Sequence, residues 1–365
     1  MSVHVQNGAQ TVSSASLSEF VARLFSAAGL SNAAAAAVAA GLVEADLEGL
    51  SSHGVMLVDM YIDRLLKGSV SRHETASIIS ERQGAVVLDA GHALGQLTGT
   101  QAMTLAVSKA RQFAAGIVSV RHGFHFGKAG QYSKQAAEAG CIGITMCNTR
   151  PLMPAPGGAE RVVGNNPIAI ALPTAGPIPV VLDMATSEAA MGKIRMAEKA
   201  KDAIPLTWAV TAQGEPTTNP SEAIAGMLLP SGGPKGFGLS FMIDLMCGVL
   251  SQGATGSQVQ PLYGDFSVPY DCSHLFIAID VAHFCDIDWF RQQTADAAER
   301  IRSGRRVSDV EQLFTPGEPE WRRRERSGGN IRLEPTVVAM LARIASELGL
   351  TSTPFQTPAK EQRHA

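Results

Sequence analysis

The first residues that could do chemistry in this chain are Ser52, His53 and Gly54. They lie between two segments with helical periodicity, so the imidazole would project from a loop that two helices support. A histidine in such a loop can exchange a proton near neutral pH when a carboxylate, such as that of Asp183, fixes its tautomer. The alternative is that Ser52 caps a helix and His53 is an ordinary surface residue.

A second histidine motif, His125, Phe126 and Gly127, directly precedes a predicted helix. Glycine at such a position lets backbone N–H groups approach a pyrophosphate at the start of the helix. An ordinary turn between a strand and a helix would explain the same residues. The spacing of this motif is therefore a weak signal by itself.

Further clusters of glycine and polar residues lie at residues 156–158 with 164–167, at 183–187 and at 232–236. Asp183 ends an apolar strand, where its carboxylate needs solvent or a partner. Lys235 enters an apolar helix behind two glycines, where it suits a phosphate or a ribose, although a flexible loop lysine is the alternative. No G-x-G-x-x-G follows a strand and no G-x-x-x-x-G-K-[S/T] is present, so a bound nucleotide requires a different architecture.

Composition and charge exclude several classes of protein. Lys and Arg total 30 and Asp and Glu total 33, so the net charge is −3 and no basic excess exists for nucleic acid or anionic membranes. No apolar run is long enough to span a membrane, and the N-terminus resembles no export signal, so we expect a cytoplasmic protein. The five cysteines lie mostly in apolar stretches without a C-x-x-C pair, so we expect buried thiols and no metal site.

The elements that must position these clusters form an α/β pattern. A helix begins with a capping box at Ser16 and Glu19 and stops at Gly29, and two more helices cover residues 31–46 and 55–67. The later strands are expected at residues 85–89, 117–120, 141–147, 168–172, 179–184, 208–211 and 275–280, and the later helices at residues 98–113, 129–139, 187–201, 235–250, 287–301 and 336–348. Between the last two helices, the run Arg322, Arg323 and Arg324 is interpreted as a solvated face.

Taken in order, the five clusters resemble those of the type 2 malate/L-lactate dehydrogenase family, nearest its hydroxycarboxylate dehydrogenase branch. The match extends from about residue 17 to residue 350. It includes G-N-N-P-I-A at residues 164–169, where the family usually has G-T-N-P-I-A, and the tail motif of Pro316, Gly317 and Glu318. The resemblance implies a non-Rossmann α/β fold, with a large mixed, mainly antiparallel sheet flanked by helices and with helical N- and C-terminal segments.

The resemblance also implies how the chain is organised. Residues 119–285 are expected to form the NAD(P)-binding α/β domain. Residues 1–118 together with 286–365 are expected to form a helical region for substrate binding and dimerisation. The expected assembly is a homodimer that holds NAD or NADP in an extended cleft, with NAD favoured.

Roles for individual residues follow from the same resemblance. Ser52, His53 and Asp183 match the family's proton relay, in which the histidine is the acid in reduction and the base in oxidation. His125 matches a second histidine that is the alternative base, and we favour His53. The residues that match cofactor contacts are His125, Phe126, Gly127, Lys128, Asn148, Leu182, Asp183, Met184, Lys235, His274, Leu275 and Phe276.

Two departures from the family affect the expected function. Many members carry arginine four residues after the first histidine, where it would hold a substrate carboxylate, and this chain has Leu57 there. Arg150 or Arg195 is a substitute cation, unless the substrate is bulkier and less polar. The second departure is His122-Gly123 in place of Asn-Ser before the cofactor loop.

The expected activity is hydride transfer between NAD(P) and a small 2-hydroxy acid or its 2-oxo acid. One alternative is NAD(P)H-dependent reduction of the C=N bond of a cyclic imino acid. Another is a homolog that binds a small ligand without catalysis.

Overall fold

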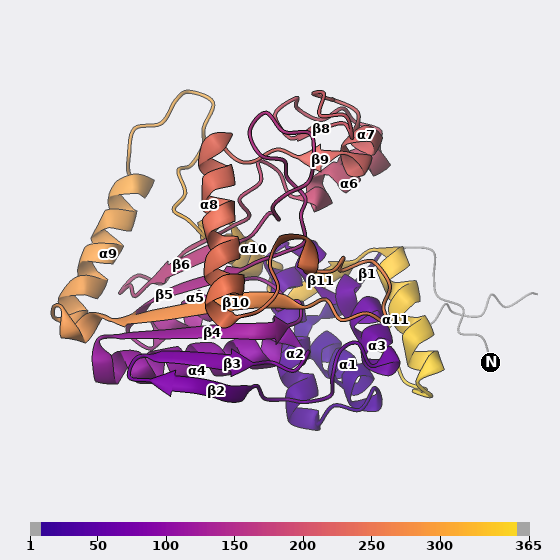
Figure 1. Cartoon of the computed structure of the whole chain (residues 1–365), viewed down its shortest axis with the longest axis horizontal. Helices are drawn as coiled ribbons and strands as arrows, with labels where there is room; N and C mark the ends of the chain where they lie inside the picture. Colours follow the sequence, from indigo (N-terminus) through magenta and orange to yellow (C-terminus); the bar gives the residue numbers. More distant parts are fainter. Residues whose placement is uncertain (1–8, 356–365) are drawn as a thin grey trace, which may run out of the picture.

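A seven-stranded mixed sheet forms the centre of the computed structural model, which describes residues 9–355 (Figure 1). The strand order is β2, β3, β4, β10, β5, β6, β7, and every neighbouring pair is antiparallel except β3 with β4. In that order the strands are Ser77–Arg82, Ala85–Asp89, Ala115–Gly123, Cys272–Asp280, Cys141–Cys147, Ile168–Leu172 and Val180–Met184. The predicted non-Rossmann α/β fold is confirmed.

Helices cover both faces of this sheet. On one face lie α4 (Gly95–Phe113) and α5 (Gly130–Glu138), and on the other lies α8 (Pro234–Asp244), which continues as a π-helix over Leu245–Val249. Successive residues of a strand point to opposite faces. Along β10, Phe276 therefore joins the large core on the α4 side, whereas Leu275 packs with Ile243 of α8.

The N-terminal helices pack together beside the sheet. α1 (Ser14–Ala27), α2 (Asn32–Leu47), α3 (Val58–Lys67) and the C-terminal α11 (Pro335–Glu347) share the large core. The expected capping box at Ser16 is wrong, because α1 begins earlier and the hydroxyl of Ser13 accepts a hydrogen bond from the N–H of Ser16. Two 3₁₀ turns, Ser51–His53 and Val55–Leu57, join α2 to α3, so His53 lies at a helix junction as expected.

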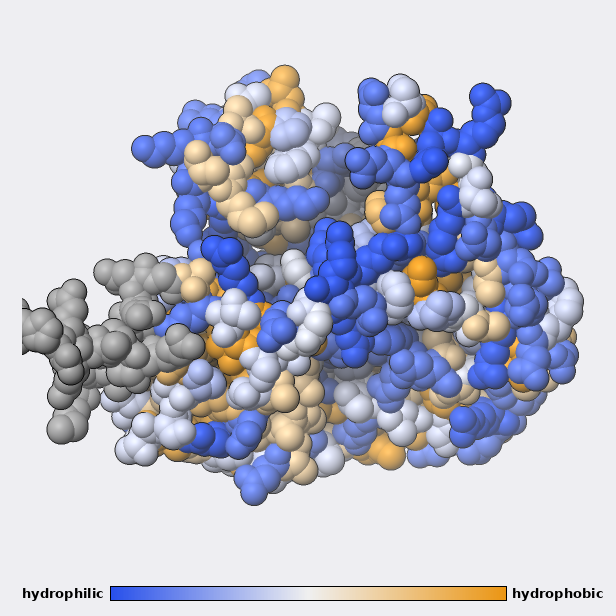
Figure 2. All heavy atoms as spheres, turned by 180° about the vertical axis from the view of Figure 1, so that it is seen from behind, coloured by the Kyte–Doolittle hydropathy of each residue, from blue (hydrophilic) through white to orange (hydrophobic). Residues whose placement is uncertain are grey.

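A smaller lobe stands apart from the sheet (Figure 1). It contains α6 (Met191–Ala200), α7 (Pro220–Ala225) and the short antiparallel pair β8 (Ala209–Val210) and β9 (Met227–Leu228). Its separate core includes the fully buried Ile194 and Leu228. α9 (Ile287–Arg302) projects on the same side of the sheet, and Figure 2 shows the surface hollowed between the two projections.

Several elements were not predicted: β2, α7, β9, the pair formed by β1 (Gln10–Ser13) and β11 (Asn330–Leu333), and α10 (Glu318–Ser327). α10 has no apolar stripe, because one glutamate, Glu318, is its single buried residue. Its arginine run, expected as a solvated face, instead forms ion pairs with Glu318, Glu320 and Glu44. The pair of Arg324 with Glu44 connects α10 to α2, and the other two pairs lie within α10.

The predicted division into residues 119–285 and residues 1–118 with 286–365 cuts through one strand. β4 crosses the 118/119 boundary, and β2 and β3 of the same sheet lie before it. Residues 1–8 and 356–365 lie outside the described part of the chain. The functions assigned to the two regions stay predictions. Within residues 9–355, no helix has the length and apolar character needed to cross a membrane.

Candidate active site

The rings of His53 and His125 stack on each other where the α2–α3 junction meets the end of β4. Their centroids are 5.7 Å apart and their planes are inclined by 23°. The Oγ atom of Ser52 lies 3.0 Å from Nδ1 of His53, and the phenol oxygen of Tyr61 lies 2.6 Å from Nδ1 of His125. Among the described residues, no group bonds to Nε2 of either ring. Both Nε2 atoms therefore remain available to a ligand.

A buried chain of hydrogen bonds positions the ring of His125. The side-chain amide of Gln96 donates to the phenol oxygen of Tyr61 at 3.0 Å, and this oxygen lies 2.6 Å from Nδ1 of His125 and 3.5 Å from the carbonyl oxygen of the same residue. When the phenol donates to Nδ1, the neutral ring carries its proton on Nε2. Burial, followed by the charges of His53 and His274, lowers the pKa of His125 to about 3. His125 is thus neutral at physiological pH, and in the tautomer with the proton on Nε2 it is a hydrogen-bond donor.

Asp46 fixes the loop that carries His53 through a hydrogen bond to the backbone. Its carboxylate accepts a hydrogen bond from the N–H of Val55 at 2.8 Å. Gly54 is required here, because a Cβ atom at this position would lie 2.2 Å from the Asp46 carboxylate. Burial raises the pKa of Asp46 to about 6, although the bond from Val55 opposes the rise. Burial and the charge of Lys128 lower the pKa of His53 below its ordinary value.

The expected hydrogen bond between Asp183 and His53 is not present among the described residues. Ser52 lies at Nδ1 of His53, and Asp183 accepts a hydrogen bond from the N–H of Gly130 at 2.7 Å. Sequence reasoning also missed the roles of Tyr61, Gln96 and Asp46. All three lie in helices, where periodicity indicates which side chains face the core but not which polar groups meet there.

Asp183 lies in a cavity with about 840 Å³ of empty space, a volume that includes open solvent at its mouth. Four segments contribute its walls: the end of α2, the start of α5, β7, and the chain that enters α10. Three predicted cofactor contacts, Lys128, Leu182 and Asp183, line it together with Pro316 and Gly317 of the tail motif. The structure thus brings together parts of the chain that the sequence separates widely.

The cations of this cavity are already paired. Lys128 forms an ion pair with Glu48, and Lys134 and Arg324 both approach Glu44. Asp183 has no ion pair with any described residue, and its side chain is open to the cavity. Desolvation by the surrounding protein raises its pKa to about 6, although Gly130 and Lys128 oppose the rise. Asp183 keeps acceptor capacity that a ligand hydroxyl would satisfy.

Other predicted cofactor contacts are committed to the core. Asn148 donates its two amide protons to Asp244 and to the carbonyl of Ala254, and its own carbonyl accepts from the N–H of Ser273. Its side chain therefore has no free donor. His274, Leu275 and Phe276 of β10 are fully buried, and none of them lines the cavity.

The remaining predicted contacts do not line the cavity. Phe126 is buried and stacks on His274, with ring centroids 4.4 Å apart. Gly127 has a φ of 77°, which favours glycine, and turns the chain toward α5. Lys235 is exposed at the start of α8 and has no ion pair within the described chain. Met184 ends β7 next to Asp183. Their contact with a cofactor stays a prediction.

Arg150, Arg161 and Arg195 lie close enough together for their charges to interact. Arg150 is half-buried after β5 and has no hydrogen bond or ion pair with a described residue. Burial, followed by the charge of Arg161, lowers the pKa of Arg150, and Arg195 contributes in the same direction. Arg195 lies on α6, and this helix approaches the histidine loop: a Cβ atom at Gly192 would lie 3.7 Å from Cβ of Ser52.

Comparisons with known proteins agree with this fold. Residues 12–342 match the family described as malate/L-lactate dehydrogenase. The chain is 39% identical over 310 residues to a malate dehydrogenase of Pyrococcus abyssi, and the alignment covers 83% of this chain and 84% of that protein.

Two solved structures are also similar. Sulfolactate dehydrogenase from Methanocaldococcus jannaschii has a TM-score of 0.88 and 33% identity, covering 94% of this chain and 98% of that chain. The Δ1-piperideine-2-carboxylate reductase from Pseudomonas syringae has a TM-score of 0.82 and 27% identity, covering 92% of this chain and 100% of that chain.

The fold and site define a dehydrogenase that does not use a Rossmann domain. The chain belongs to the malate/L-lactate dehydrogenase family. It is a nicotinamide-dependent oxidoreductase that acts on a hydroxy acid. The family, fold and reaction class predicted from the sequence are confirmed.

Proposed function

We propose that this chain interconverts a 2-hydroxy acid and its 2-oxo acid with NAD, and that His53 exchanges the proton. The observation that carries the proposal is the stacked pair of imidazoles, in which a hydroxyl group holds Nδ1 of each ring and Nε2 is left free. Two such nitrogens suit a substrate oxygen that alternates between hydroxyl and carbonyl.

The two histidines have different tasks in this proposal. His125, neutral and protonated at Nε2, donates a hydrogen bond to the substrate oxygen. His53, oriented by Ser52, takes the hydroxyl proton during oxidation and returns it during reduction. When bound, the nicotinamide accepts the hydride in oxidation and supplies it in reduction.

Alanine substitutions test this division of tasks. H53A should lower kcat by about 10²- to 10⁴-fold, the usual contribution of general acid–base catalysis. H125A should cost about 10- to 100-fold, because it removes one hydrogen bond to the substrate oxygen. H53A should bind NADH like the wild type in a fluorescence titration. Turnover is followed at 340 nm with pyruvate, oxaloacetate, 2-oxoglutarate and phenylpyruvate. If H125A were inactive and H53A retained turnover, the two roles would be exchanged.

The charges of the cavity favour NAD over NADP. Asp183 has free acceptor sites for the two hydroxyls of an adenosine ribose. A 2′-phosphate in their place would meet Asp183, Glu48 and Glu320, while the nearby Lys128 is already paired. We expect kcat/KM for NADH to exceed that for NADPH by about tenfold or more, and D183S to reduce this preference. A wild-type preference for NADPH would contradict the assignment.

We propose that Arg150, assisted by Arg195, holds the substrate carboxylate. Leu57, which stands where many family members have arginine, is only 1% exposed and serves the core. R150M should raise the KM for the oxo acid by about tenfold or more and leave the KM for NADH unchanged. R161M is the matched control, because the Arg161 guanidinium is already engaged by the carbonyls of Ala225 and Gly226. Equal effects in both variants would count against the proposal.

Reduction of a cyclic imino acid is the second candidate. The similarity to the piperideine-carboxylate reductase supports it, and the same pair of histidines would protonate nitrogen in place of oxygen. An assay with NADH or NADPH and Δ1-piperideine-2-carboxylate beside the oxo acids decides between the two. Turnover of the imine alone would replace the first candidate by the second.

An apolar stripe along α8 and the π-helix that follows it supports the proposed homodimer. Leu239, Met242, Met246 and Val249 recur at helical spacing and are 37–60% exposed. Exposed apolar stripes of this kind mark interaction surfaces, and a two-fold pair would bury two copies of it. Light scattering should give twice the mass of the chain, and the double substitution M242D/M246D should give a monomer. F284D, at an exposed phenylalanine outside the stripe, is the control. A monomeric wild type would overturn the proposal.

A further inference from the structure

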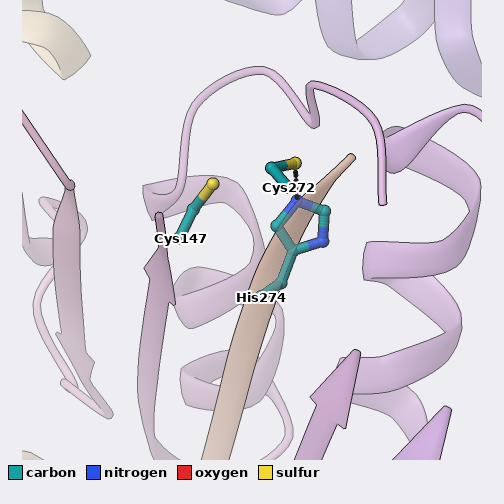
Figure 3. Close-up of side chains that lie close together, drawn as sticks. All are labelled: Cys147, Cys272 and His274. Atoms are coloured by element: carbon teal, nitrogen blue, oxygen red, sulfur yellow. Dashed lines mark hydrogen bonds between the residues drawn. The ribbon is translucent and has the colours of Figure 1, made fainter. Parts of the chain in front are cut away.

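Two thiols and an imidazole meet in the core where β5 ends and β10 begins (Figure 3). The sulfur atoms of Cys147 and Cys272 and one ring nitrogen of His274 all lie within 4.8 Å of one another. Strand pairing explains the arrangement: Cys147 is the register partner of His274, and Cys272 lies two residues earlier on β10. The sequence contains no local metal motif, because these residues meet only through the sheet. We call them the thiol–imidazole cluster.

The cluster is dry and incompletely hydrogen-bonded. Cys272 and His274 have no exposed surface, and Cys147 is 4% exposed. The Sγ atom of Cys272 lies 3.2 Å from Nε2 of His274, while Nδ1 of the same ring is buried without a partner. Cys147 also hydrogen-bonds to Cys272 and His274, and its thiol donates to the carbonyl of Asn148 at 2.9 Å. The two sulfur atoms and Nε2 therefore face one another in the core, while Nδ1 points away from the sulfurs (Figure 3).

We propose that the thiol–imidazole cluster binds one thiophilic cation with a filled d shell, Zn²⁺ or Cu⁺. Thiolate and imidazole are ligands that both ions prefer. At bond lengths of about 2.3 Å to sulfur and about 2.0 Å to nitrogen, tetrahedral ligand atoms lie about 3.5–3.8 Å apart, so the side chains need to shift by only about 1 Å. Binding releases the two thiol protons to solvent. Zn²⁺ with two thiolates is neutral, which suits a dry core, whereas Cu⁺ is satisfied by three ligands.

A bound ion would stiffen the support of the histidine pair. The ring of His274 stacks on Phe126 with centroids 4.4 Å apart and planes inclined by 12°, and Phe126 follows His125 directly. The ion would join the ends of β5 and β10 beneath this loop. Loading should therefore raise the melting temperature, because the ion binds the folded chain preferentially. It should leave the preference of the enzyme for its substrates unchanged.

Metal content after loading during folding tests the proposal. The full chain is refolded with Zn²⁺, or anaerobically with Cu⁺, then dialysed against EDTA and analysed by mass spectrometry of the elements. We expect about one retained ion per chain with one of the two metals. C272S should lower the retained metal by about tenfold or more. C285S is the matched control, because Cys285 is a free cysteine outside the cluster, and it should retain the ion.

X-ray absorption of the loaded wild type keeps the test decisive if C272S does not fold. A shell of two sulfur atoms at about 2.3 Å would identify the ligands directly. Three results would overturn the proposal: less than about 0.1 ion per chain with both metals, a shell without sulfur, or equal loss of metal in C285S. The cluster would then be a hydrogen-bonded part of the core.

Discussion

Replacing Tyr61 with phenylalanine isolates the orientation of His125 from the other features of the site. The substitution removes one oxygen atom from a fully buried side chain and keeps the ring that contacts Phe25 and Phe124. It deletes the 2.6 Å contact with Nδ1 of His125 and the 3.0 Å bond donated by Gln96. Hydrogen bonds are lost, while packing is retained.

The expected magnitudes follow from the groups that lose their partners. Gln96 is buried and its Oε1 atom has no partner, so Y61F leaves its amide without a side-chain hydrogen bond. Leaving a buried polar group unpaired costs about 1–3 kcal/mol, so we expect the free energy of unfolding to fall by about 2 kcal/mol. The released His125 ring can move its proton to Nδ1, which removes the donor at Nε2. A loss of about 1.4–2.8 kcal/mol in the transition state lowers kcat by about 10- to 100-fold.

Urea unfolding measures the stability of Y61F, and the 340 nm assay measures its kcat and the KM for NADH. The control is Y270F: Tyr270 is also buried, and its hydroxyl has no hydrogen-bond partner in the described chain. Y270F should therefore match the wild type in kcat. A Y61F enzyme with reduced stability but wild-type kcat would refute the role of His125 as an oriented donor.

Three further substitutions test the groups around the site. The pKa of Asp46 is raised to about 6, so its ionisation destabilises the folded chain as the pH rises from about 4 to about 6. The stability of D46N relative to the wild type should therefore increase between about pH 4 and 7, by at most about 3 kcal/mol, in thermal melts. A difference that does not change with pH would count against this. R64M should lower the free energy of unfolding in urea by about 3 kcal/mol, because the buried Arg64 donates hydrogen bonds to backbone carbonyls between residues 261 and 268. An unchanged unfolding midpoint would show that water satisfies these carbonyls when the guanidinium is removed. K128M should weaken NADH binding, because it leaves the negative charge of Glu48 unpaired in the cavity. Adding E48Q to K128M should restore much of the affinity in a double-mutant cycle, and additive effects of the two substitutions would exclude this coupling.

Strands at the centre of the sheet could be predicted because burial leaves a pattern in the sequence. β5 and β10 are bordered by strands on both sides, and their apolar residues extend over almost their whole length. β2 lies at the edge and its residues are mostly exposed, so it has no alternation to detect. α10 was missed for a related reason, because ion pairs of Glu318 with Arg302 and of Arg324 with Glu44, rather than an apolar stripe, attach it to the protein.

The site was predictable only as far as its motifs are local. The positions of His53 and His125 follow from short segments, and the structure places the two rings together. Their hydrogen-bond partners do not follow, because Tyr61 and Gln96 reach His125 from helices distant in sequence. Asp183 was assigned to the relay by resemblance, and the geometry associates it with Gly130 and the cavity instead.

The arrangement of Leu57 and Arg150 has a consequence for specificity. An arginine at position 57 would extend from the same helical segment as His53, whereas Arg150 follows β5 and is joined by Arg195 from the smaller lobe. In the proposed arrangement the carboxylate is therefore bound from the side of this lobe. Gly192 leaves α6 close to Ser52, so a small shift of the lobe changes the distance between Arg195 and the histidine pair. Substrate length would then be selected by the position of α6, and G192A should alter the relative KM values of short and long oxo acids more than kcat.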